Sequence, residues 1–165
     1  MENQIDIAVA PAEAPEDIDA VRGLFRDYAQ FMGFELCFDG FDKELSGLPG
    51  PYAPPGGDLL LCRVGGAPAG CVATARLASG VAELKRLYVR PEYREMKIGR
   101  NLTRLAMGKA GEAGYVSIRL ETIPDRMAAA DRMYRKLGFE RVACAAGTDS
   151  RIVCYSRALA DLTGK

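Results

Sequence analysis

The sequence predicts an α/β (α+β) protein: one domain with a mixed, mostly antiparallel sheet and helices on both faces. Three strand-like segments follow one another between residues 58 and 89, joined only by short turns that contain glycine, and this favours antiparallel pairing. Elsewhere, segments with helical spacing of apolar residues alternate with strand-like segments, as expected when helices cover a sheet. The 165 residues can bury one core, so we predict a single domain over residues 1–165.

The N-terminal part of the chain contains one strand pattern and two helix patterns. Ile5–Ala10 alternates apolar and polar residues, which predicts a strand. Pro15 suits the first turn of a helix, and acidic residues follow it. The apolar face of this helix is expected to comprise Ile18, Val21, Phe25, Tyr28 and Met32. A shorter helix with an Asp cap is predicted within Phe38–Leu48, before a loop rich in proline and glycine.

The remaining chain continues as strands and helices. The predicted strands are Asp58–Val64, Pro68–Leu77, Val81–Val89, Tyr115–Thr122, Phe139–Ala143 and Arg151–Leu159. Within the fourth of these, Val116, Ile118 and Leu120 are expected on one face. One helix is predicted from Ile98 to Gly114, and another from Asp125, as its cap, to Gly138, as its stop.

Composition excludes several classes of function. The 22 basic and 22 acidic residues cancel, so no overall field attracts nucleic acid or an anionic membrane. No run of about 18 apolar residues could span a bilayer. The N-terminal residues do not have the pattern of a secretory signal, so a cytoplasmic location is expected.

The chain has five cysteines and no histidine. The odd number of cysteines and the absence of a C-x-x-C pair argue against a disulfide framework or a zinc site, and favour buried thiols in a reducing compartment. Without histidine, the Ser-His-Asp and Cys-His arrangements and histidine-based metal sites are excluded, and no metal is expected. Any acid or base must be Glu, Asp, Tyr, Lys or Cys.

The segment LYVRPEYREMKIGRNL, from Leu87 to Leu102, runs from a predicted strand into a predicted helix. A helix N-terminus offers unpaired amides and a partial positive charge, which suit a phosphate group. Arg94, Lys97 and Arg100 add cations to this turn, and Glu95 removes one. Phosphate loops are usually rich in glycine. Because only one glycine is present here, both a phosphate cradle and an ordinary turn stay open.

Two segments together resemble the GNAT superfamily of acetyl-CoA-dependent N-acetyltransferases: ELKRLYVRPEYREMKIGRNL, which ends at Leu102, and AADRMYRKLGF, which ends at Phe139. The resemblance spans about Leu59 to Val142. It implies a GNAT-like fold, acetyl-CoA as co-substrate, and acetyl transfer to a primary amine by direct attack. The family pattern is R/Q-x-x-G-x-G/A, usually with another glycine after the first residue. If Lys97 has a positive φ, a lysine there costs about 1 kcal/mol, although its charge would favour a diphosphate.

The resemblance also implies which residues form the site. The cofactor is expected to bind a splayed strand and the loop after it, through Leu87, Tyr88, Val89, Arg94, Glu95, Met96, Lys97, Ile98, Gly99 and Arg100. Tyr134 stands where the family has the general acid for the departing thiolate. From the residues alone, Tyr134 could equally be core, because it shares an apolar helix face with Ala130 and Met133.

The base that deprotonates the acceptor has two candidates. By a two-residue period, Glu83 is expected to share a strand face with Lys85, Leu87 and Val89. Partial burial would raise its pKa towards that of a useful base, but Glu83 could instead form a structural ion pair with Lys85. Glu121 is the second candidate, and its alternative is a solvent-facing carboxylate.

The acceptor is predicted to be a small-molecule or peptide amine. Asp39, Asp42 and Glu44 could attract such a cation, or could simply form a solvated helix face. The oligomeric state stays open: Arg151–Leu159 could complete the sheet of a homodimer, but the sequence does not decide this. Two other functions stay open: a non-catalytic acyl-CoA-binding or regulatory module, and an interaction domain that has lost the site.

Overall fold

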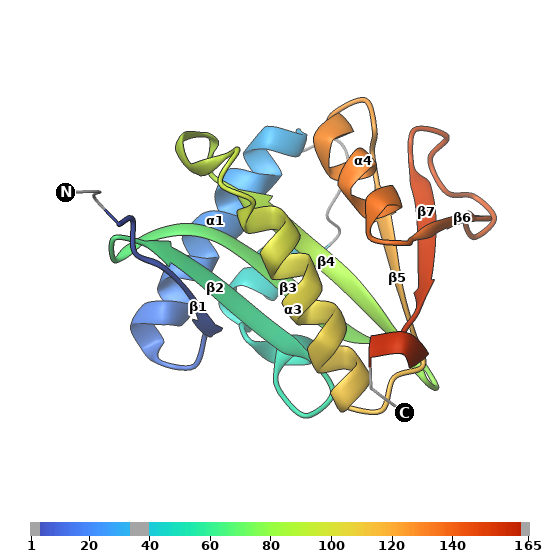
Figure 1. The fold of residues 1–165 in the computed structure, drawn as a ribbon, viewed down its shortest axis with the longest axis horizontal. Helices are drawn as coiled ribbons and strands as arrows, with labels where there is room; N and C mark the ends of the chain where they lie inside the picture. Colours follow the sequence, from blue (N-terminus) through green and yellow to red (C-terminus); the bar gives the residue numbers. More distant parts are fainter. Residues whose placement is uncertain (1–3, 34–39, 163–165) are drawn as a thin grey trace.

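A seven-stranded sheet forms the centre of this computed structural model, which describes residues 4–33 and 40–162 (Figure 1). The strand order is β1-β2-β3-β4-β5-β7-β6. The strands are β1 (Ile7–Pro11), β2 (Asp58–Val64), β3 (Ala67–Ala78), β4 (Val81–Val89), β5 (Ser117–Thr122), β6 (Glu140–Val142) and β7 (Val153–Ala158). Among the described strands, β4 and β5 are the one pair that runs in parallel. The predicted mixed, mostly antiparallel sheet is therefore confirmed.

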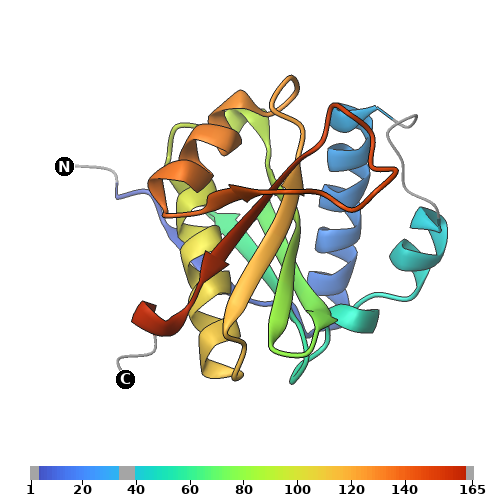
Figure 2. The same cartoon turned by 90° about the vertical axis from the view of Figure 1, so that its right-hand side faces the viewer.

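Helices cover both faces of this sheet, as predicted (Figure 2). On one face lie α1 (Pro15–Met32) and α2 (Phe41–Ser46), and on the other lie α3 (Ile98–Glu112) and α4 (Ala128–Lys136). The sheet separates two apolar cores, one beneath α1 and α2 and one beneath α3 and α4. In the part of the chain that the structure describes, no helix is long and apolar enough to cross a bilayer.

Strands β4 and β5 pair over only three residues and then separate. The register runs from Val81 opposite Ser117 to Glu83 opposite Arg119, although β4 itself continues to Val89. Beyond Glu83, β4 stays paired with β3 on its other side. The splayed strand that the sequence resemblance implied is therefore present, and it leaves one edge of β4 without a strand partner.

A β-bulge interrupts β4 within this unpaired stretch. Ala73 and Cys71 of β3 lie opposite Lys85 and Tyr88 of β4, so β4 carries one extra residue there. Arg86 takes the left-handed conformation at this point, with φ of 59°. A bulge changes which face the following side chains occupy.

The bulge makes one sequence prediction wrong. Glu83 and Lys85 do not share a face with Leu87 and Val89, because the extra residue breaks the two-residue period between them. Leu87 instead joins the core beneath α3 together with Leu84, and Val89 packs against the same core. Glu83 and Lys85, which alternate with Leu84, belong to the face of the sheet that α1 and α2 cover.

Three local predictions are also corrected. The helix α4 begins at Ala128 with Met127 as its N-cap, not at Asp125, because a turn intervenes in which Met127 N–H bonds to the Ile123 carbonyl at 2.9 Å. Val116 precedes β5 and is 66% exposed, so it does not share the buried face of the strand. The N-cap of α2 is Gly40, with φ of 76°, and not an aspartate; within the described residues no side chain caps this helix.

The last strand is not a free edge. β7 lies between β5 and β6, with antiparallel pairing on both sides. Arg151–Leu159, which we considered as a strand that could complete a dimer sheet, therefore contains an interior strand and not an edge strand. The terminal strand on this side of the sheet is β6.

Cys144 and Cys154 form a disulfide, so the prediction of free thiols is wrong for this pair. The hairpin of β6 and β7 brings the two residues to a Cα–Cα distance of 5.5 Å, which linear spacing could not show. Cys62 and Cys71 are free and buried, as predicted, and Cys37 lies outside the described residues.

We expect Cys144→Ala to lower the free energy of unfolding by about 3 kcal/mol under oxidising conditions, because the disulfide restricts the unfolded chain. The measurement is denaturant unfolding of the variant and the wild type, each with and without reductant. The difference should vanish in reductant. A difference of equal size in both conditions would mean that the thiols are not paired.

Candidate active site

The loop between β4 and α3 takes an unusual backbone conformation. Glu95 has φ of 70°, and Lys97, the N-cap of α3, has φ of 61° and ψ of 20°. This left-handed region favours glycine and costs other residues about 1–2 kcal/mol each. These two positions are those at which the family pattern has glycine. The loop therefore keeps a backbone suited to glycine while carrying a glutamate and a lysine.

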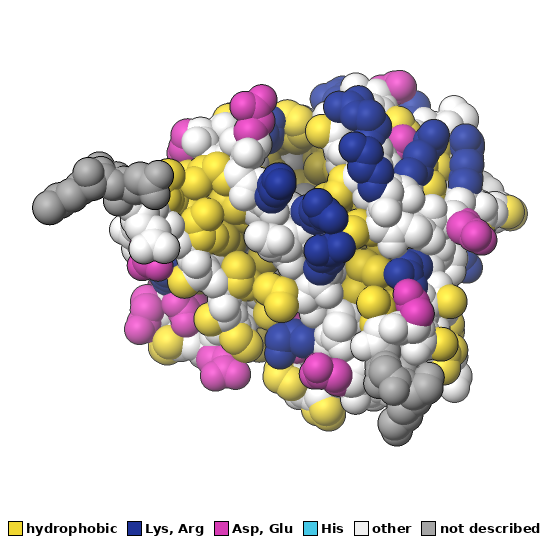
Figure 3. Space-filling view, viewed as in Figure 1, with side chains coloured by type: hydrophobic (Ala, Val, Ile, Leu, Met, Phe, Trp, Pro, Cys, Tyr) yellow, Lys and Arg dark blue, Asp and Glu magenta, His cyan; other side chains and the backbone are white. Residues whose placement is uncertain are grey.

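The first turn of α3 presents backbone amides that the helix itself does not use. The N–H of Asn101 bonds to the Lys97 carbonyl at 3.1 Å, so the amides of Ile98, Gly99 and Arg100 precede the helical bonding pattern. In the part of the chain that the structure describes, no side chain caps this end of the helix. Lys97 and Arg100 are exposed here, and Lys and Arg side chains gather over α3 and α4 (Figure 3). The turn is thus suited to an anion.

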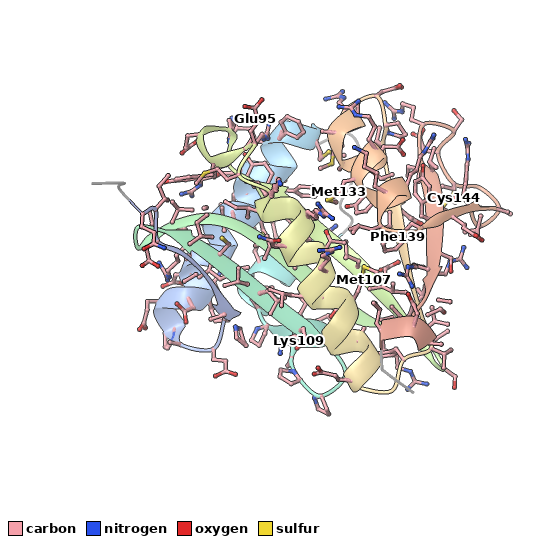
Figure 4. The ribbon with its side chains drawn as sticks, in the orientation of Figure 1. Glu95, Met107, Lys109, Met133, Phe139 and Cys144 are labelled. Atoms are coloured by element: carbon pink, nitrogen blue, oxygen red, sulfur yellow. A yellow bond between two sulfur atoms is a disulfide. The ribbon has the colours of Figure 1, made fainter. Side chains whose placement is uncertain are left out.

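Arg94 lies on the other side of this loop. Its guanidinium sits 5.0 Å from the ring centre of Phe31 and 5.9 Å from that of Tyr88. Its Nε donates to the Val89 carbonyl at 3.1 Å. Arg94 therefore ties the loop to the end of α1, next to which Figure 4 shows Glu95. The Arg94 guanidinium therefore lies next to α1.

The start of α3 packs between the end of β4 and α4. A Cβ added at Gly99 would lie 3.8 Å from Val89 Cγ2 and 4.0 Å from the sulfur of Met133, which Figure 4 shows on α4. These are ordinary contact distances, so alanine would fit there. Gly99 is thus not at a position whose backbone conformation favours glycine. Those positions are occupied by Glu95 and Lys97.

A cavity of about 340 Å³ opens where β4 and β5 have separated. Helices α1 and α4, strands β4 and β5 and the loops beside them supply its lining: Tyr28, Met32, Glu83, Leu84, Lys85, Arg86, Leu87, Glu121, Thr122, Ile123, Met127, Tyr134 and Ile152. Of the residues predicted from the sequence, Tyr134, Glu83, Leu87 and Glu121 come together here. Tyr88, Val89 and the loop from Arg94 to Arg100 lie outside this lining.

Tyr134 both packs in the core and lines the cavity. It is only 4% exposed, and its ring lies 5.6 Å from that of Phe139 and 6.4 Å from that of Tyr155, centre to centre. Burial raises the pKa of its phenol, and the nearby Tyr28 and Asp131 raise it further. The phenol therefore stays protonated at neutral pH, as a proton donor must.

The two candidate bases lie on facing strands. Glu83 is 3.6 Å from the ammonium of Lys85, so the ion pair that we considered does form, between two partly exposed side chains. Such pairs contribute about 0–1 kcal/mol. Glu121 is exposed on β5. Both carboxylates reach the cavity, so the choice between them stays a prediction.

Arg86, which sequence reasoning missed, also lines the cavity. Its guanidinium binds Glu44 of α2 through both carboxylate oxygens, at 2.9 Å and 3.0 Å, and the two side chains are only 13% and 16% exposed. Burial and the neighbouring Glu44 carboxylate raise the pKa of the Tyr52 hydroxyl. Glu44 is thus neither a solvated residue nor a free anion for the acceptor. Asp39 lies outside the described residues.

One signal in the sequence could have indicated Arg86. The strand Val81–Val89 has the alternating pattern of a strand with one buried face, and two consecutive charged residues, Lys85 and Arg86, interrupt this pattern. A charge that lies towards the interior needs a partner, so an arginine there predicts a buried acid elsewhere. Thr122, the other missed residue, gives no such signal, because threonine is an ordinary strand residue.

A comparison with protein families matches residues 21–139 to the acetyltransferase (GNAT) family. The chain belongs to the GNAT family of acetyltransferases. It is an acyltransferase enzyme, as the sequence resemblance implied. An uncharacterized N-acetyltransferase of Schizosaccharomyces pombe is 36% identical over 137 residues, which cover 82% of this chain and 83% of that protein.

Solved structures of GNAT proteins share the fold. An acetyltransferase of Staphylococcus aureus superposes with a TM-score of 0.76 at 22% identity, over 93% of this chain and 99% of the other. The PaiA N-acetyltransferase of Thermoplasma acidophilum, solved in complex with coenzyme A, superposes with a TM-score of 0.72 at 20% identity. It matches over 93% of this GNAT chain and 99% of its own.

We expect Glu44→Ala to destabilise the protein by about 3 kcal/mol, because it leaves the Arg86 charge buried without its carboxylate partner. The control is Asp42→Ala on the same helix, where the side chain is exposed, and its effect should stay within about 0.5 kcal/mol. Guanidinium unfolding measures both. Equal effects of the two variants would contradict a role for the pair in holding the bulge.

Proposed function

We propose that this protein transfers the acetyl group of acetyl-CoA to a primary amine by direct attack of the amine on the thioester. The observation that carries the proposal is one arrangement: the anion-suited turn of α3 lies beside the splayed edge of β4, and Tyr134 lines the cavity at that splay. The coenzyme A complex of the Thermoplasma acidophilum neighbour supports acetyl-CoA as the co-substrate.

In this proposal the loop holds the diphosphate of the cofactor. Backbone amides from Glu95 to Arg100 would bond the phosphate oxygens, where the dipole of α3 adds a partial positive charge. Lys97 and Arg100 add whole charges. Arg94 acts indirectly, since its contacts with Phe31 and the Val89 carbonyl fix the position of the loop.

The free edge of β4 would hold the acylated arm. Backbone groups without a strand partner can bond a thioester carbonyl and the amides of the arm. Leu87 lines the cavity and would bond the thioester, while Tyr88 and Val89 would bond the arm, Val89 being next to Gly99 of the phosphate turn. Tyr88 would contribute only its backbone, because its side chain packs in the core beneath α1.

Tyr134 would protonate the departing thiolate. As the amine nitrogen bonds to the carbonyl carbon and the carbon–sulfur bond breaks, the phenolic proton passes to sulfur. The raised pKa makes the phenol a weaker acid, but the same apolar surroundings also raise the pKa of the thiol that forms. The acceptor nitrogen loses its proton to Glu83 or Glu121, directly or through water.

One observation favours a second candidate, a non-catalytic acyl-CoA-binding module. Glu95 and Lys97 occupy the two left-handed positions of this loop at a cost in stability, and both are exposed. Such a module would bind acetyl-CoA but release no thiol with any amine. We favour the enzyme because Tyr134 and two carboxylates line one cavity.

The acceptor that we propose is a small-molecule or peptide amine. Glu83 and Glu121 would draw an ammonium group towards the thioester, whereas they would repel a nucleic acid. A cytoplasmic location stays a prediction from the sequence. The oligomeric state stays open, and β7 is an interior strand of the sheet.

We expect Lys97→Gly and Lys97→Asn each to weaken acetyl-CoA binding about fivefold, because both lose a charge-assisted contact with the diphosphate. Both residues tolerate a positive φ, so neither variant should be less stable than the wild type. Isothermal titration measures the affinity, and Arg141→Asn on β6 is the control. Tighter binding by the glycine variant would instead mean that the lysine side chain obstructs the cofactor.

We expect Tyr134→Phe to lower kcat about 100-fold and to leave acetyl-CoA affinity within about twofold, because only the proton donor is lost. Thiol release from acetyl-CoA, first screened over a panel of primary amines with the wild type, measures the rate. Tyr115→Phe is the control, since its hydroxyl bonds to the Gly56 carbonyl and lies outside the cavity. An unchanged kcat would remove Tyr134 from the mechanism.

A further inference from the structure

The hydroxyl of Thr122 is buried without a hydrogen-bond partner. The residue is 6% exposed, and within the described ranges its Oγ1 is the one buried side-chain oxygen or nitrogen for which no partner is present. Leaving a hydroxyl buried and unpaired costs free energy. A strand position of this kind could hold valine, which has the same shape and no such cost.

Thr122 is one of the residues that line the active-site cavity, and it lies on the face of β5 that α3 covers. It follows Ile118 and Leu120 on the buried face of β5, and both of these pack beneath α3. Its partner across the β5–β7 pair, Val153, packs against the same core. This core also contains Tyr134. Thr122 therefore lies on the face of the sheet where α3 presents its phosphate turn.

The carboxylates of the cavity and Lys85 lie on the opposite face of the sheet from Thr122. Glu83 and Lys85 lie on the face of β4 that α1 and α2 cover, and Glu121 alternates with Thr122 on β5. An ammonium acceptor would be drawn to these carboxylates, away from the hydroxyl. A group that meets Thr122 therefore comes from the α3 side of the sheet. An acceptor oxygen on that group would satisfy the hydroxyl proton, which has no acceptor among the described residues.

We propose that the Thr122 hydroxyl donates a hydrogen bond to a carbonyl oxygen of the acylated arm of acetyl-CoA, beside Tyr134. The carbonyl belongs either to the thioester or to an amide of the arm. Thr122 is thus a cofactor-binding residue at the reacting end, on the strand that faces Leu87 across the splay. This inference rests on the proposed function, since it requires that the cavity receive an acyl-CoA.

The test uses Thr122→Val, which keeps the shape and removes the hydroxyl, and Thr122→Ser, which keeps the hydroxyl. We expect the valine variant to bind acetyl-CoA about tenfold more weakly and the serine variant to bind within about threefold of the wild type. Without ligand, the valine variant should melt at or above the wild-type temperature, because it removes an unpaired group.

Thr103→Val is the matched control for stability. Thr103 is also fully buried, but its hydroxyl donates to the Gly99 carbonyl at 2.7 Å. Removing this satisfied hydroxyl should lower the melting temperature of the ligand-free protein. If Thr122→Val lowered it in the same way and left the affinity unchanged, the hydroxyl would be structural and the proposal overturned.

Coenzyme A without the acetyl group separates the two carbonyls. Equal weakening for coenzyme A and acetyl-CoA would assign the bond to an amide of the arm, and weakening for acetyl-CoA alone would assign it to the thioester. Both results support the proposal. Wild-type protein that binds neither ligand would overturn the proposed function itself, whereas normal wild-type binding with an unaffected valine variant overturns only the role of Thr122.

Discussion

The separation of β4 from β5 after Glu83 and Arg119 is the constraint on which the rest of the site depends. A parallel pair that continued would use the backbone of β4 and close the cavity. Because the strands part, one edge of β4 is free for a ligand, and side chains from both strands face a shared space. The bulge at Arg86 lies in this stretch, and its bidentate contact with Glu44 ties the free part of β4 to α2.

Much of the fold was predictable because its causes are local. Tight turns set the hairpins from Asp58 to Val89, and helical spacing identified Val21, Phe25 and Met32 as buried residues of α1. The errors arose where a residue depends on a distant partner. The two-residue period failed at the bulge, which pairing with β3 defines. The Cys144–Cys154 disulfide required the geometry of a hairpin that sequence spacing does not reveal.

The phosphate turn shows why residue identity is an incomplete guide to such a loop. Glycine is favoured at a positive φ because it lacks a Cβ, but the conformation is only costly for other residues, not forbidden to them. Glu95 and Lys97 take it, while Gly99, the glycine that the sequence keeps, has room for a methyl group. What an anion meets is the direction of the amides and the local charge. The backbone conformation therefore decides whether the turn can bind a phosphate, and the count of glycines does not.

Some residues of the candidate site could be predicted from the sequence and others could not. Tyr134 and Glu83 stand in or beside segments whose pattern the family shares, so both could be named before the structure. Thr122 could not be named, because threonine is common in strands whether or not its hydroxyl has a function. Its role depends on the absence of a partner around one oxygen, which only three-dimensional packing defines. A buried hydroxyl without a bond lowers the stability of the ligand-free protein, and a carbonyl from a ligand would remove that cost. The stability lost at this position and the affinity gained there would then have the same physical origin.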